Sequence, residues 1–154
     1  MIKRTLFLLL ILVTSACTTQ PTEEPTPTPI PNAPYVLLQE ENPYTPKMDD
    51  LNLKQDGVLL TSLDLSERYD LTPIRAEFHI LGSIPTTCSQ LRIKVNPPND
   101  KYQINIEIYS VSNPLPKCEN VFQQIDAVIL LGVYSSGKYT VWVNDSYVGD
   151  FASY

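Results

Sequence analysis

The stretch QINIEIYS, residues 103–110, alternates between polar and apolar side chains along most of its length. On an extended chain its isoleucines, Ile104, Ile106 and Ile108, share one face, and the opposite face carries Gln103, Asn105, Glu107 and Tyr109. A period of two is that of a β-strand with one buried face. The stretch therefore predicts a strand whose isoleucines contact a hydrophobic core.

Other segments of the same character lie on both sides of this strand. They are GVLLTSLDL (57–65), IRAEFHIL (74–81), QLRIKV (90–95), AVILLGV (127–133) and the two arms of KYTVWVNDSYVGDF (138–151). The last reads as a hairpin that turns at Asn144, Asp145 and Ser146, because Asn and Asp tolerate the positive φ of tight turns. Seven short strands separated by turn signals predict an all-β protein, an antiparallel β-sandwich over residues 57–154. We expect at most a turn or two of helix, at 66–71 or 118–124.

The N-terminal residues have the pattern of an export signal. Lys3 and Arg4 precede eight apolar residues, 6–13, too few for a membrane-spanning helix, which needs about 20. The following Thr14-Ser15-Ala16-Cys17 resembles the bacterial lipobox, in which the cysteine receives a diacylglyceryl group and the acylated protein is held at the membrane. We therefore predict a lipoprotein signal peptide at 1–16 and lipid attachment, palmitate included, at Cys17. The alternative is an ordinary signal peptide that leaves Cys17 as a thiol.

The segment after Cys17 is rich in proline and threonine. Six prolines fall within residues 18–34, a composition that favours an extended polyproline II spacer over a packed structure. At about 3.1 Å per residue, the spacer at 17–34 reaches at most roughly 50 Å. We expect residues 35–56 to form an extended segment that leads into the sandwich.

Charge and cysteine count limit the partners and the chemistry. Without residues 1–16 the chain has 11 − 2 = 9 basic and 17 acidic residues, a net charge of 9 − 17 = −8, which argues against binding nucleic acid or anionic lipid. The chain has three cysteines, and an odd cysteine in an exported protein needs an explanation. If lipid modifies Cys17, then Cys88 and Cys118 remain to form a disulfide. Zinc ligation is disfavoured, because His79 is the one histidine and no C-x-x-C pair exists.

Two motifs resemble a known kind of module. GSIPTTC (82–88), a second cysteine at 118 and a closing G-x-Y-x-V-x-V-N pattern (137–144) are similar to an uncharacterised module of exported bacterial lipoproteins. The resemblance implies an immunoglobulin-like β-sandwich pinned by Cys88–Cys118. It implies no catalytic residues.

The sequence argues against an enzyme. G-x-S-x-G and H-E-x-x-H motifs are absent, and His79 is expected to lie in an exposed polar cluster with Arg75 and Glu77. The acidic residues near Asp49 and Asp50 lack calcium-loop spacing, so we expect neither a metal site nor a cofactor.

The aromatic residues are the candidate binding residues. Trp142 and Tyr109 are both predicted to point outward from strands that could be neighbours, where they would form a contact surface. The alternative is cross-strand aromatic packing that only stabilises the sheet.

Together these patterns predict a membrane-tethered binding or structural module outside the cytoplasm, at the cell membrane or cell surface. Its partner would be an envelope or extracellular protein or a glycan. A protease inhibitor is the alternative, with proline-stiffened loops at 96–100 and 112–117.

Overall fold

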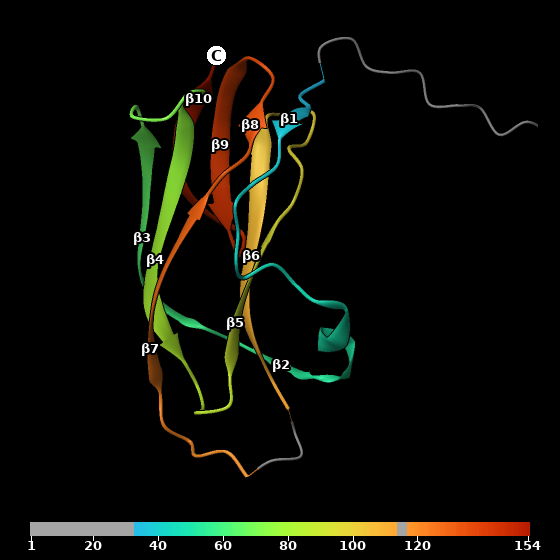
Figure 1. Cartoon of the computed structure of the whole chain (residues 1–154), viewed down its shortest axis with the longest axis vertical. Helices are drawn as coiled ribbons and strands as arrows, with labels where there is room; N and C mark the ends of the chain where they lie inside the picture. Colours follow the sequence, from blue (N-terminus) through green and yellow to red (C-terminus); the bar gives the residue numbers. More distant parts are fainter. Residues whose placement is uncertain (1–32, 114–116) are drawn as a thin grey trace, which may run out of the picture.

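The computed structural model describes residues 33–113 and 117–154, and Figure 1 shows the arrangement of the strands. The predicted signal peptide, Cys17 and nearly all of the spacer lie outside the described residues. The elements are β1 (Val36–Leu38), the 3-10 helix η1 (Met48–Asn52), β2 (Lys54–Asp56), β3 (Leu59–Arg68), β4 (Arg75–Ile84), β5 (Gln90–Val95), β6 (Gln103–Ser112), β7 (Gln123–Leu130), β8 (Val133–Tyr134), β9 (Gly137–Val143) and β10 (Ser146–Ser153).

The strands form two main sheets, which confirms the predicted all-β sandwich. The large sheet has the order β10-β9-β6-β2, with β5 also paired to β6, and the small sheet has the order β3-β4-β7. The seven expected strands correspond to β3–β7, β9 and β10. The remaining three, β1, β2 and β8, have two or three residues each, too few for a period of two to be visible in the sequence.

One strand pair departs from the expected antiparallel arrangement. β6 and β9 are parallel, with Gln103 opposite Thr140 and Ile106 opposite Val143. The chain leaves the small sheet at the end of β7 and enters β9 at the end of the sandwich where β6 also begins (Figure 1). The two strands therefore run in the same direction.

The core lies where the alternation places it. The isoleucines of β6 are buried, as are the inward residues of the neighbouring strands, namely Phe78, Ile80, Ile93, Tyr139, Val141 and Val143. The alternation in 74–81 places Ile74 on the inward face with Phe78 and Ile80, but Ile74 is exposed, because β4 begins at the residue after it. No helical turn forms at 66–71 or 118–124, where at most one or two were expected: Ser66–Arg68 belong to β3, and β7 begins at Gln123.

Residues 35–56 fold around the sandwich, and we call them the N-terminal wrap. Glu41 exchanges two backbone hydrogen bonds with Leu130 at the free edge of β7, of 2.9 and 3.1 Å. Three residues later, Tyr44 O accepts the N–H of Ile93 at the free edge of β5, at 3.0 Å. The wrap thus covers an edge of each sheet, which would otherwise present unpaired backbone groups. In chain order, the first strand of the large sheet is β2, which pairs with β6 and ends at Asp56, before residue 57.

The predicted disulfide is present. Cys88 and Cys118 are bonded, with 5.6 Å between their Cα atoms, and they join the β4–β5 connection to the segment before β7. Glu119 and Thr87 add two hydrogen bonds of 3.2 Å beside the bridge. This crosslink ties the two sheets together at the end of the sandwich opposite β1.

Candidate functional site

An edge of β6 lacks a strand partner at its centre. On this side β9 pairs with Gln103–Ile106 and β2 pairs with Ser110–Ser112, so the residues between them face a gap. The side chain of Asn144 fills the gap. Its Oδ1 accepts the N–H of Ile108 at 2.9 Å, and its Nδ2 donates to the Ile108 carbonyl at 3.0 Å.

The position of Asn144 follows from the hairpin turn. Asn144 and Asp145 have φ values of 44° and 67° and form the two-residue loop between β9 and β10. Positive φ at both central residues is the type I′ geometry that matches the twist of paired strands. Because the turn also lets the N–H of Asn144 donate to Ile106 O at 3.0 Å, the side-chain amide is held against β6.

Three adjacent hollows follow β6 on the outer face of the large sheet, and we call them together the β6 groove. The central hollow, about 600 Å³, shares Gln55 and Tyr109 with the hollow on one side, and Glu107 and Asn144 with the hollow on the other. The outer two measure about 340 and 460 Å³. The groove is open, and its lining is about equally polar and apolar. Four parts of the chain form it: the wrap with the adjacent Gly57, Asn96 after β5, strand β6 and the β9–β10 hairpin.

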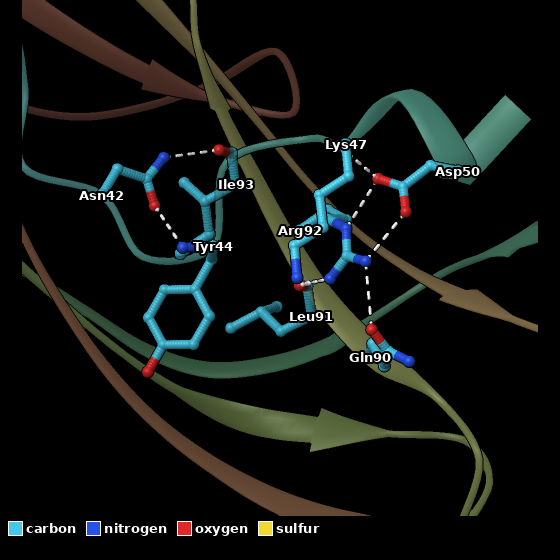
Figure 2. Close-up of polar contacts among 8 residues, drawn as sticks. All are labelled: Asn42, Tyr44, Lys47, Asp50, Gln90, Leu91, Arg92 and Ile93. Atoms are coloured by element: carbon cyan, nitrogen blue, oxygen red, sulfur yellow. Dashed lines mark hydrogen bonds and ion pairs between the residues drawn. The ribbon is translucent and has the colours of Figure 1, made fainter.

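The wrap forms one wall of the β6 groove. An ion pair attaches it to the large sheet (Figure 2). Arg92 of β5 donates from Nε to Asp50 Oδ2 at 2.7 Å and from a terminal nitrogen to Oδ1 at 2.8 Å. The side chains are only 6% and 11% exposed. Arg92 also donates to Leu91 O and to Gln90 Oε1, so its buried guanidinium is well supplied with acceptors.

The ion pair shifts the pKa values of both Asp50 and Arg92. The hydrogen bonds from Arg92 lower the pKa of Asp50 to about 2, and the backbone N–H of Lys47 assists. The same hydrogen bonds raise the pKa of Arg92. The alternation in 90–95 places Arg92 on the outer face of the sheet, and the structure confirms this. Arg92 is nevertheless buried, because the wrap covers that face.

The groove carries acidic groups. Lys54 lowers the pKa of Asp56, and Lys94 with Asn96 lowers that of Glu107, so both carboxylates are ionised at neutral pH. Each lysine is already engaged by one of these carboxylates, at 2.8 and 2.7 Å. The groove therefore offers hydrogen-bond acceptors, and the one cationic side chain among its described lining residues is Lys47, in the hollow beside the wrap.

The two aromatic candidates lie on neighbouring strands of this sheet but have different surroundings. Tyr109 lines two of the three hollows. Trp142 is opposite Asn105, four residues before Tyr109 on β6, or about 13 Å along a strand. It stacks edge-on against Tyr147 at 5.6 Å, which is the cross-strand packing of the alternative interpretation. The sequence does not identify three residues that line the groove, namely Asn144, Glu107 and Gln55. The Asn-Asp turn is nevertheless a signal for Asn144.

The expected polar cluster around His79 is divided among separate partners. His79 Nε2 lies 2.7 Å from Asp126 Oδ1, whereas Glu77 pairs with Arg68. Arg75 is buried, because the wrap covers it and Glu41 pairs with it. In the described ranges, no three His, Cys, Asp or Glu residues are grouped so as to hold a metal ion. Nor does that part of the chain contain a helix long and apolar enough to cross a membrane.

Fold and disulfide define a β-sandwich module. Residues 78–153, just under half of the chain, match the family model of the ORF11 beta-sandwich domain. The match begins inside β4, so the wrap and β3 lie outside it, and it includes Tyr109, Trp142 and Asn144. No curated protein matches this chain. No solved structure matches it either.

Proposed function

We propose that this protein is a membrane-tethered binding module outside the cytoplasm and that the β6 groove is its contact surface. The observation that carries the proposal is the groove itself: three connected hollows over the outer face of one sheet. A recognition site needs a few well-placed polar groups and an apolar or aromatic surface. Glu107, Asn144 and Tyr109 provide these on a rigid sheet.

The tether follows from the sequence. A signal peptide at 1–16, a lipid on Cys17 and a spacer to residue 34 would hold the sandwich within roughly 50 Å of the membrane. The disulfide supports the same location, because such bonds persist in oxidising compartments.

The lining of the groove limits the partner. Asp56 and Glu107 are paired with lysines, and the lining also includes Asp145 and Lys47, so its charges nearly balance. We therefore expect a neutral partner that donates hydrogen bonds to the groove. Asn144 already satisfies the edge of β6, so an added peptide strand would find no free backbone groups at Ile108. Recognition would therefore use side chains, which suits an envelope glycan or the surface of a folded protein.

The protease-inhibitor alternative has one loop in the described residues, 96–100. Asn99 Oδ1 accepts the N–H groups of Lys101 and Gln103 at 2.9 and 3.0 Å, and the loop folds back on itself. A loop that enters a protease cleft must instead be extended. The second loop, 112–117, includes residues outside the description. These contacts favour the groove over the loops as the contact surface.

Site-specific photo-crosslinking tests the contact surface. A photo-reactive phenylalanine analogue replaces Tyr109 in the full chain, expressed in its native host, and Phe122 is replaced as the exposed control. We expect an adduct from position 109 that Glu107→Ala diminishes, and none of the same mass from position 122. An absent adduct at 109, or equal adducts at both positions, would contradict the assignment of the groove.

Mass spectrometry and fractionation test the anchor independently. The mature protein should begin at a diacylglyceryl-modified Cys17, and Cys17→Ser should release it from the membrane fraction. An unmodified N-terminus, or a serine variant that stays membrane-bound, would contradict the tether.

A further inference from the structure

Exposed apolar side chains gather at the end of the sandwich where the described chain begins. The cluster, which we call the apolar end, consists of the exposed residues Leu38, Tyr69, Pro73, Ile74 and Tyr154 and the half-buried Leu71. The two tyrosines are 72% and 85% exposed. They come from the wrap, the β3–β4 connection and the residue after β10 (Figure 1).

These side chains form one surface. Leu38, Leu71 and Pro73 line one hollow, and Pro73, Ile74 and Tyr154 line the next, so Pro73 joins the two. Tyr69 borders the same surface: its pKa is raised chiefly by a hydrogen bond to Glu67 and to a smaller extent by nearby Tyr154.

The chain outside the structure identifies the occupant. The described residues begin at Ala33, next to β1 on the apolar end, and the proposed lipid site is 16 residues upstream. The spacer keeps the apolar end within roughly 50 Å of the bilayer, so its effective concentration at the bilayer surface is far higher than that of an untethered chain. A weak apolar contact is then sufficient for occupancy, and tyrosine is well suited to the interfacial region.

We propose that the apolar end docks on the lipid headgroup region of the membrane that anchors the chain. The inference rests on the proposed tether at Cys17. Docking at this end would hold the long axis of the sandwich upright, with the disulfide end farthest from the bilayer.

Charges around the apolar end set its lipid preference. Glu41 pairs with Arg75, Asp70 with Arg68, and Asp150 with Lys138, so each of these three cations is already neutralised by a carboxylate. Glu67 adds a further negative charge. The contact is therefore apolar and not polybasic, and anionic lipid should weaken it.

Hydrogen exchange on vesicles tests the docking. The mature chain, from Cys17, carries one thiol outside the disulfide, and this thiol is coupled to a maleimide lipid in phosphatidylcholine vesicles. The same chain capped with N-ethylmaleimide stays in solution. Because the lipid is attached chemically, the test does not depend on whether the cell modifies Cys17.

We expect residues 35–38, 69–74 and 152–154 to exchange about twofold more slowly, or slower still, on the vesicles. Residues 119–122, at the opposite end, should be unchanged. Ile74→Asp should abolish the protection, whereas Phe122→Asp, an equivalent change at the opposite end, should preserve it. If Ile74→Asp fails to fold, Tyr154→Asp replaces it, because Tyr154 lies outside any strand.

Three results would overturn the inference. They are absence of protection at the apolar end, equal protection at residues 119–122, or protection that increases when phosphatidylglycerol is added. Cys17 could prove to be unmodified in the cell while the coupled chain still shows the protection. This outcome would refute the proposed lipid tether but support the affinity of the apolar end for lipid.

Discussion

Removing the carboxylate of Asp50 should weaken the attachment of the wrap to the large sheet and lower the stability of the protein. Asp50→Asn deletes a bidentate ion pair with Arg92 in which both side chains are nearly buried, and a buried pair that loses one partner typically costs 3–5 kcal/mol. The shift in the pKa of Asp50 from 3.8 to about 2 corresponds to about 2 kcal/mol. Arg92 keeps two other acceptors, so we expect a loss of about 2–4 kcal/mol in the free energy of unfolding.

Urea denaturation of the full chain, followed by the fluorescence of Trp142, measures this loss. Glu107→Gln is the matched control, because its pair with Lys94 is half exposed and should be worth no more than about 1 kcal/mol. The double variant Asp50→Leu/Arg92→Met should recover most of the stability, since it leaves no buried charge unpaired.

The pH dependence provides a second readout. The folded pKa of Asp50 is depressed, so its contribution is complete above about pH 4 and is lost as the pH falls through 2. The difference between the wild type and Asp50→Asn should therefore shrink in acid. A loss in Asp50→Asn no larger than that in Glu107→Gln would refute the role of the pair.

Three further outcomes are expected. Burial raises the pKa of Tyr134 from 10.0 to about 12, so stability should fall by roughly 3 kcal/mol between these pH values, and Tyr134→Phe should remove most of this dependence. Reduction of Cys88–Cys118 should cost about 3–4 kcal/mol without abolishing the fold, and thiol labelling of the denatured, unreduced chain should find neither cysteine free. Asn144→Gly keeps the positive φ but loses the amide, so unfolding titrations should show a loss of about 1–2 kcal/mol, whereas Asp145→Gly should be neutral or slightly stabilising.

The alternation of side chains was sufficient to predict the long strands. In β6 and β9 every residue that the alternation places inward is buried. A shift of one residue would move all of the apolar side chains to the solvent face, so only one orientation of the strand buries them. The disulfide was predictable by cysteine count. The hairpin turn was predictable from Asn144 and Asp145, whose side chains tolerate the positive φ that the structure shows.

The wrap could not be predicted in this way. Its contacts with Leu130 and Ile93 are made by backbone groups, which leave no pattern in the side chains. The alternation places Arg92 on an outward face, and the sequence predicts Arg75 in an exposed polar cluster, yet the wrap buries both. The groove was missed for the same reason, since Gln55 and Asp56 reach it only because the wrap turns back toward β6.

Deleting the wrap should therefore damage the sandwich as well as the groove. A chain that begins at residue 57 would leave the edges of β5 and β7 unpaired and would uncover two guanidiniums that have lost their carboxylates. Exposed strand edges pair with other molecules, so we expect association during size-exclusion chromatography and a lower free energy of unfolding than in the full chain. A chain that begins at residue 35 is the control and should behave as the full chain does. If the shorter chain were monomeric and equally stable, the wrap would be an accessory to the sandwich. The family match starts inside β4 and leaves the wrap out, so this comparison asks whether the matched region, with β3 and the start of β4, forms a stable module without the wrap.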